Sequence, residues 1–291
     1  MSAWLETYRG VVYRWEVDHN DHLTVAYYFA RLGDATLALL QALGLPPEGD
    51  GGQWVSADCH VRYLRELRVG DILHICSGPI AVERDGLAAA HQLINTGSGE
   101  VVTTFEQRLR LLAPDGRPAS LSAADRERLE ARRVAWDGPA RERRARPQSL
   151  DGLCESARDT IRPWEAGGSV PGALAAYVHR FSGANSHVLA AFGLTPAYMR
   201  EQHRGFSTFE FQFGATRPLE AGAPVVVRSA LTHVGTTSLR LFHLMSDVRT
   251  GAELATLHQS GVHFDQDARR PAPLPLELAS RARALLVPAA D

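Results

Sequence analysis

The spacing of apolar residues changes along the chain in an order that then repeats. An apolar-rich stretch from residue 24 to residue 43 ends at Gly44 and predicts a long helix. From residue 54 to residue 63, apolar and polar residues alternate, which predicts a strand with one buried face. The apolar positions of that strand are Val55, Ala57, Cys59, Val61 and Tyr63. The segment Asn95–Gly99 is typical of a hairpin turn between two later strands.

The second half of the chain predicts the same order of elements. A long helix is predicted from residue 171 to residue 192, with a proline suited to its first turn. Phe209, Phe211 and Phe213 then have the spacing of the alternating strand. The remaining predicted elements are a short strand at 11–17 and polar helices at 122–133 and 276–286.

Matching residues indicate that the two halves are copies of one unit. Trp15-Glu16 recurs as Trp164-Glu165, a separation of 149 residues. Farther along the chain the separation is 152 residues and stays constant, and a three-residue insertion before Phe206 accounts for the change. The pairs at this second separation include His91 with His243 and Gly99 with Gly251. Because chance seldom keeps register over such a length, we interpret the pattern as an internal repeat.

Each copy places one long helix before consecutive strands, which is an α+β arrangement. The order and length of the elements resemble the hotdog fold, in which a sheet wraps one helix, so the sequence predicts a tandem double hotdog. We place the two hotdog domains at residues 1–135 and 159–291, with an Arg-rich linker at 136–158. We favour a solvated linker over a binding site for nucleic acid or for CoA phosphates, to which four arginines could contribute: Arg141, Arg143, Arg144 and Arg146.

The composition narrows the classes of function. A net charge of −2 gives no reason to expect a nucleic-acid or membrane partner. All 31 basic residues are arginine, which excludes lysine Schiff-base chemistry and a P-loop phosphate site. The cysteines, Cys59, Cys76 and Cys154, suggest neither a disulfide framework nor a zinc site. The first residues lack a signal-peptide pattern and charges interrupt the apolar runs, so we expect a cytoplasmic protein.

Two common hydrolytic site types are not indicated by the sequence. Four histidines lack metal-ligand spacing with nearby carboxylates, so we predict no metal site: His91, His243, His258 and His263. No Gly-x-Ser-x-Gly motif occurs, which argues against an α/β-hydrolase esterase.

The turn before the first helix carries the residues that point to a reaction. From residue 15 it reads Trp-Glu-Val-Asp-His-Asn-Asp-His-Leu-Thr-Val-Ala-Tyr-Tyr. It resembles the Asp-x-x-Gly-His-Val-Asn-Asn-x-x-Tyr signature of the hydroxybenzoyl-CoA-type hotdog thioesterases, with Asp18, His22 and Tyr28 at signature positions. The match is closer still to the thioesterases of carnitine and betaine breakdown, on the run from His60 to Leu67 and on further residues of the turn: Asn20, Val25, Ala26 and Tyr27.

The resemblance implies that Asp18 is the catalytic carboxylate and an acyl-CoA the substrate, with no cofactor besides the CoA of that substrate. A helix N-terminus offers unpaired N–H groups and a positive dipole end, so a helix that starts just after Asp18 puts a carboxylate and an oxyanion site within one turn. Asp18 could deprotonate water or attack the thioester itself. His22, the second catalytic candidate, could orient the substrate, relay a proton or cap the helix. We assign substrate binding to Asn20, Thr24 and Tyr28.

Two residues depart from the signature. Asp21 replaces its glycine, and Thr24 replaces its first asparagine. Asp21 could raise the pKa of one of two neighbouring carboxylates, or either residue could cap the helix, and we favour capping. On the alternating strand we interpret Asp58 and His60 as solvated, and we expect His19 to face solvent.

The second copy lacks the candidate chemistry of the first. Gly167 takes the place of Asp18 and Pro171 that of His22, whereas the tyrosine is kept as Tyr177. We therefore expect one working site per chain, with the second copy as its structural partner, and double-hotdog chains could also form a homo-oligomer.

The leading function is hydrolysis of a small or medium acyl-CoA thioester. The carnitine-type resemblance suggests a cationic acyl group. Four aromatic residues could contact such a cation, although we interpret them as core residues: Trp15, Trp54, Tyr27 and Tyr28. The alternatives are a non-catalytic acyl-CoA-binding protein in which Asp18 only caps a helix, an acyl-carrier-protein thioesterase, and a hotdog hydratase.

Overall fold

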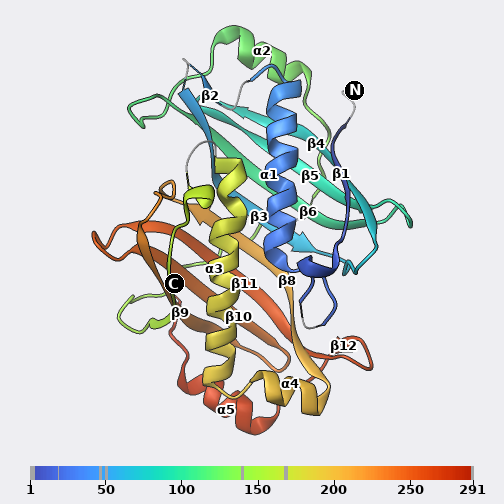
Figure 1. Ribbon diagram of the computed structural model, residues 1–291, viewed down its shortest axis with the longest axis vertical. Coiled ribbons are helices and arrows are strands. Elements are labelled where there is room, and N and C mark those ends of the chain that lie inside the picture. Colours follow the sequence, from blue (N-terminus) through green and yellow to red (C-terminus); the bar gives the residue numbers. More distant parts are fainter. Residues whose placement is uncertain are drawn as a thin grey trace. The chain divides into compact units, whose positions relative to one another are not determined.

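The computed structural model describes residues 4–18, 20–45, 48–49, 52–138, 141–166 and 170–289. Two copies of one arrangement follow each other along the chain, each with a long helix and an antiparallel sheet (Figure 1). The predicted α+β double hotdog is therefore confirmed.

The first copy forms a sheet with the strand order β1-β4-β5-β6-β3, in which all neighbours are antiparallel. Its long helix, α1 (Val25–Ala42), ends one residue before the predicted position. The other elements are β1 (Leu5–Val11), β2 (Glu48–Gly49), β3 (Gly52–Tyr63), β4 (Ile72–Glu83), β5 (Gly86–Asn95), β6 (Val101–Leu112) and α2 (Ala123–Ala131).

The second copy forms the order β8-β11-β10-β9-β7, again antiparallel, and contains the predicted helix α3 (Val170–Ala191). A short helix that we had not predicted, α4 (Pro196–Gln202), begins after Thr195, whose side chain accepts the N–H of Tyr198. The other elements are β7 (Cys154–Thr160), β8 (Arg204–Ala215), β9 (Pro224–Val234), β10 (Ser238–Asp247), β11 (Glu253–Asp265), β12 (Arg270–Pro271) and α5 (Leu276–Ala284).

The chain forms two compact units. The first contains residues 1–141, 163–178 and 218–220, and the second contains 142–162, 179–217 and 221–291. The domain limits at residues 135 and 159 stay a prediction. None of the helices in the described ranges combines the length and the apolar character that a membrane crossing requires.

The core of the first unit lies between α1 and the sheet. Apolar residues recur along α1 at helical spacing, so one face of the helix is buried. Phe29 of α1 meets Phe105 of β6 edge to face, with ring centroids 6.3 Å apart. Farther along α1, one buried cluster joins the helix to β3, β5, β6 and α2: Leu39, Leu40, Leu43, Trp54, Leu87, Leu109 and Leu129.

The predicted strand at 11–17 is wrong. β1 ends at Val11, and residues 14–16 form a single 3-10 turn. The turn carries the Glu16 side chain inward, where its Oε2 lies 2.7 Å from a terminal nitrogen of the buried Arg31. The same nitrogen donates to the Val11 carbonyl at 3.0 Å. A long-range ion pair therefore sets the end of this strand.

The buried face of β3 changes partway along the strand. The pairing with β6 shifts between Ser56 and Asp58, which makes Ala57 a β-bulge. Trp54 and Ser56 are therefore buried before the bulge, and Cys59 and Val61 after it, so the predicted phase is right only in the second part. The second copy has the matching bulge at Phe209, where the pairing of β8 with β11 shifts.

Two side chains expected to be solvated have other surroundings. His60 is buried, with 3% of its surface exposed. The carboxylate of Asp58 accepts a hydrogen bond from each terminal nitrogen of Arg141, one of them at 2.8 Å. The expectation of a solvated polar face on β3 is therefore wrong, because His60 is buried and Arg141 of the connecting segment pairs with Asp58.

The segment at 136–158 is more ordered than the solvated linker we expected. Its last residues belong to strand β7. Arg144 pairs with the buried Glu210 at 3.1 Å, and Arg146 pairs with Glu253 at 2.8 Å. Arg141, Arg144 and Arg146 thus each pair with a carboxylate of the protein itself, so their side chains are not simply solvated.

A buried chain of polar side chains occurs in both copies. In the first, Ser77 Oγ lies 2.6 Å from Thr7 Oγ1 and 2.7 Å from His91 Nδ1. In the second, Ser229 Oγ lies 2.6 Å from both Ser156 Oγ and His243 Nδ1. Burial lowers the pKa of His91 to about 4 and that of His243 to about 3. Both histidines are therefore neutral in the folded chain at neutral pH.

Acid is expected to destabilise the chain through these histidines. An unfolded histidine titrates near pH 6.5, so the unfolded state binds protons first as the pH falls. Stability is thus lost from about pH 6.5 down to the folded pKa values, by about 2 kcal/mol per histidine between pH 7.5 and 5. Urea denaturation at these two pH values tests this. His91→Asn should remove its own share of the dependence, and an unchanged dependence would contradict the assignment.

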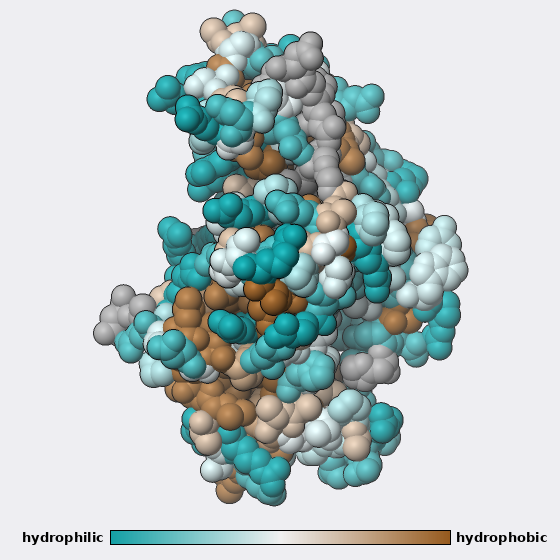
Figure 2. All heavy atoms as spheres, turned by 60° about the vertical axis from the view of Figure 1, so that its left-hand side comes forward, coloured by the Kyte–Doolittle hydropathy of each residue, from teal (hydrophilic) through white to brown (hydrophobic). Residues whose placement is uncertain are grey.

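An apolar cavity of about 290 Å³ lies in the second unit. It is lined by the end of α3, by β9 and by residues 284–287, among others. Cys154 and Val188 border it at positions where the first copy has the larger Leu5 and Leu39. Figure 2 shows a broad apolar area on the lower half of the face it presents. The smaller side chains at these two positions leave room for the cavity in the second unit.

Filling the cavity should stabilise the protein. Val188→Leu adds one methylene group next to the cavity and should raise the free energy of unfolding by about 1 kcal/mol. The matched change in the first copy, Leu39→Val, should lower it by about 1 kcal/mol, because Leu39 is fully buried. Urea denaturation of both variants tests the pair, and a loss of stability in Val188→Leu would show that the space is not available to a side chain.

Candidate active site

The loop before α1 holds the carboxylate of Asp18 with its own backbone. Asp18 Oδ1 accepts the N–H of Asn20 at 2.8 Å and that of His22 at 3.2 Å. The N–H of Asp18 donates to the His22 carbonyl at 2.8 Å. No described residue donates to Oδ2. The loop therefore fixes one carboxylate oxygen and leaves the other available to a reactant.

The first turn of α1 follows directly after this loop. Thr24 is the N-cap residue, as predicted, but its side chain makes no capping hydrogen bond. Within the described ranges, the N–H groups of Val25 and Ala26 have no acceptor. The helix start thus combines unpaired N–H groups with the positive end of the helix dipole, as an oxyanion site requires.

Asp21 does not cap the helix, contrary to our expectation. Its φ of 58° is in the left-handed region, which explains why the signature has glycine here. Aspartate tolerates this conformation better than most residues. Its carboxylate pairs with the exposed Arg14 at 2.6 Å. Asp21 therefore shapes the loop and faces solvent.

His22 joins the loop to a second loop, between β3 and β4. Its Nε2 lies 3.1 Å from Oε2 of Glu66, and both side chains are largely buried, with 19% and 25% exposed. Leu23 also donates its N–H to the Leu67 carbonyl at 2.8 Å. Sequence reasoning missed Glu66 as a site residue, although it lies in the run from His60 to Leu67 that resembles the carnitine-type enzymes.

Tyr28 lies below the loop in the protein core. It is 4% exposed, and its ring meets that of Tyr63 edge to face at 5.1 Å. Burial raises the pKa of Tyr28 well above its ordinary value. The loop thus brings Asp18, Asn20 and His22 together, whereas Tyr28 packs in the core. The role of Tyr28 in substrate binding stays a prediction.

The other aromatic candidates divide between core and surface. Trp54 is a core residue, as we expected, with 2% exposed. Trp15 is 71% exposed and stacks on Tyr13 with centroids 4.5 Å apart, so the core interpretation is wrong for it. Its counterpart Trp164 is similarly exposed. His19 and Gly167 lie outside the described residues, as does the side chain of Pro171.

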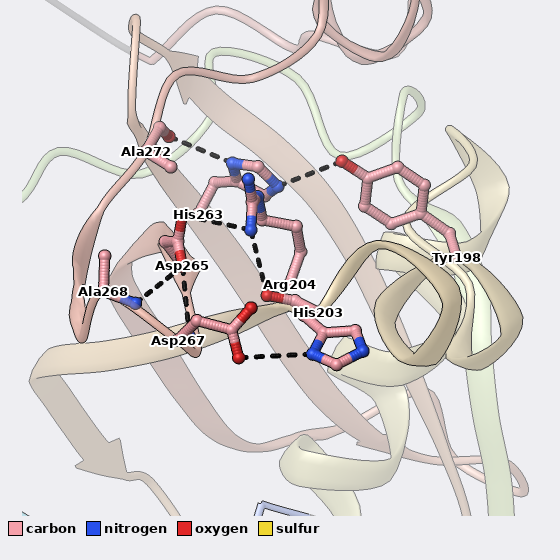
Figure 3. Close-up of polar contacts among 8 residues, drawn as sticks. All are labelled: Tyr198, His203, Arg204, His263, Asp265, Asp267, Ala268 and Ala272. Carbon is pink, nitrogen blue, oxygen red and sulfur yellow. Dashed lines mark hydrogen bonds and ion pairs between the residues drawn. The ribbon is translucent and has the colours of Figure 1, made fainter.

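A second polar cluster, in the second unit, has a structural role (Figure 3). The buried His263 has Nδ1 3.0 Å from the Ala272 carbonyl, so Nδ1 carries the proton. Its Nε2 therefore accepts from the Tyr198 hydroxyl at 3.2 Å. These bonds join β11, α4 and the segment after β12. Within the described ranges, no three His, Cys, Asp or Glu side chains come together as metal ligands would.

Two copies of a long helix on an antiparallel sheet form the double hotdog that the sequence predicts. The chain belongs to the thioesterase-like superfamily, whose family model matches residues 11–132 and again 167–282. It is a thioester hydrolase.

Known relatives agree with this class. The chain is 31% identical to a betainyl-CoA thioesterase of Pseudomonas aeruginosa over 135 residues, which cover 45% of this chain and 85% of that relative. Two solved structures share the fold over most of the chain. A 12:0-ACP thioesterase from Umbellularia californica gives a TM-score of 0.65 at 14% identity, covering 91% of this chain and 93% of the other. An acyl-ACP thioesterase from Bacteroides thetaiotaomicron gives a TM-score of 0.61 at 13% identity, covering 88% of this chain and 96% of the other.

Proposed function

We propose that the chain hydrolyses a small or medium acyl-CoA thioester with Asp18 as its catalytic carboxylate. The observation that carries this proposal is the pairing of Asp18, held through Oδ1 only, with the unpaired N–H groups of Val25 and Ala26. A carboxylate and an oxyanion site are the two groups that thioester hydrolysis requires.

The reaction follows from this pairing. The thioester carbonyl oxygen would lie at the start of α1, where the N–H groups stabilise the negative charge that develops on it. Asp18 Oδ2 takes a proton from water as the water adds to the carbonyl carbon. The C–S bond then breaks, and the proton passes to the CoA thiolate. Asp18 could instead attack the carbonyl itself and form an anhydride that water opens, and both routes use the same geometry.

A cationic acyl group is the favoured substrate class. The Asp18 carboxylate belongs to the candidate site, and the relative from Pseudomonas aeruginosa is named for betainyl-CoA. Negative charge near the acyl group would favour a trimethylammonium over a carboxylate at its end.

A thiol-release assay with a panel of acyl-CoA thioesters tests the proposal. The panel contains betainyl-CoA, the uncharged acetyl-CoA and butyryl-CoA, and the anionic succinyl-CoA. We expect turnover that is highest with betainyl-CoA and lowest with succinyl-CoA. Binding of acyl-CoA without release of thiol would identify an acyl-CoA-binding protein instead. Turnover of acyl-carrier-protein thioesters alone would favour that second class of substrate.

A further inference from the structure

Glu66 reaches the candidate site from a distant part of the sequence. It lies between β3 and β4, yet its Oε2 is 3.1 Å from Nε2 of His22. The two loops are also joined by backbone pairing, between His22 and Arg68 and from Leu23 to Leu67 at 2.8 Å. The position of Glu66 relative to His22 is therefore set by backbone hydrogen bonds between the two loops.

His22 transmits this contact to Asp18. Its backbone N–H donates to Asp18 Oδ1 at 3.2 Å, and its carbonyl accepts the N–H of Asp18 at 2.8 Å. A change in the position of His22 therefore moves the group that holds the carboxylate. The ring of His22 thus contacts Glu66, while its backbone N–H holds Asp18.

The two copies differ at all three residues of the candidate site. Several buried polar residues of the fold are kept in the second copy: Arg31 as Arg180, Ser77 as Ser229, His91 as His243 and Gln107 as Gln259. Others are exchanged: Thr36 for Asn185, Ser56 for Thr208, His60 for Gln212 and Thr103 for Ala255. The three residues at the candidate site are replaced together: Asp18 by Gly167, His22 by Pro171 and Glu66 by Pro218. Glu66 is thus exchanged together with the two residues of the Asp18 loop, which is the behaviour expected of a residue that serves the same site.

We propose that Glu66 is a positioning residue, whose carboxylate holds the His22 ring protonated at Nε2 and so keeps Asp18 aimed at the thioester. A carboxylate beside a ring nitrogen favours the imidazolium and restricts rotation of the ring. This inference rests on the proposed function, because it assigns the support of the same catalytic carboxylate.

The Glu66→Gln variant tests the role with the size of the side chain kept. The amide cannot balance the charge of the imidazolium, so His22 should lose its proton at a lower pH. We expect kcat to fall about tenfold through displacement of Asp18, with KM within about twofold of the natural value. Glu66→Asp should recover part of kcat. The ring titration of His22, followed by nuclear magnetic resonance, reports on the contact independently of turnover.

A double-mutant cycle with His22→Gln separates positioning from a general effect on structure. In the His22→Gln background, Glu66→Gln should change kcat no further. Asp71→Asn is the matched control, because Asp71 accepts the N–H of Arg68 at 2.7 Å in the same loop without touching His22. It should leave the His22 titration unchanged.

Two results would overturn the inference: a kcat and a His22 titration in Glu66→Gln equal to those of the natural chain, or an undiminished effect of Glu66→Gln when His22 is absent. Failure of the natural chain to hydrolyse any acyl-CoA would instead count against the proposed function, and the His22 titration would still report on the contact with Glu66.

Discussion

The Glu16→Gln variant is expected to lose about 3 kcal/mol of unfolding free energy, because it leaves Arg31 charged and buried without its carboxylate. The Arg31 side chain is 4% exposed, and among the described residues its other hydrogen-bond acceptors are the carbonyls of Val11 and Tyr27. Carbonyl groups accept hydrogen bonds but do not neutralise a guanidinium. Glu16 Oε2 also accepts the N–H of Tyr13 at 2.9 Å, so the variant loosens the turn that leads to Asp18.

Urea denaturation at pH 7.5 measures this loss, with Glu6→Gln as the control. Glu6 pairs with Arg9 at 2.7 Å, the same distance, but both side chains are exposed. Water screens such a pair, so the control should be as stable as the natural chain. Equal losses in the two variants would show that burial is not the reason for the importance of Glu16.

Features that depend on local sequence pattern were predictable here. The helix at 25–42 follows from its apolar spacing and Gly44, and the hairpin at 95–99 follows from its turn residues. The loop around Asp18 was found through its resemblance to the thioesterase signature, whose residues are close in sequence. The repeat then extended both predictions to the second half of the chain.

Features that depend on distant contacts were not predictable from a single sequence. The bulge at Ala57 moves half a strand to the opposite phase without a proline or glycine to mark it. The partners of Arg141 and Arg144, Asp58 and Glu210, are at least 66 residues away. Glu66 is likewise far from His22 in sequence, and only the folded chain brings them within 3.1 Å. In each case a contact between segments that are distant in sequence decides the neighbour.

The Asp18→Asn variant is expected to keep the fold and lower kcat about 10³-fold, within the range for loss of a general base. The amide oxygen of asparagine can still accept the N–H groups of Asn20 and His22, so the loop should retain its shape. The amide can neither take a proton from water nor attack a thioester. The loss should therefore appear in kcat, with the melting temperature unchanged.

Asp21→Asn is the control for this variant. It removes a carboxylate from the same loop, but one that faces solvent and pairs with Arg14. Asparagine also tolerates the left-handed backbone at this position. Its kcat should equal that of the natural chain. A fall like that of Asp18→Asn would show that the charge of the loop matters rather than the carboxylate of Asp18.

The rate of thiol release by Asp18→Asn, with the best acyl-CoA of the panel at saturation, tests most directly whether each chain works through one carboxylate. The second copy has Gly167 at the matching position and supplies no equivalent group there. Residual turnover of about one-thousandth of the natural rate is the predicted result. Retention of half the rate would reveal a second working site in the chain, and retention of the full rate would show that Asp18 is not the catalytic carboxylate.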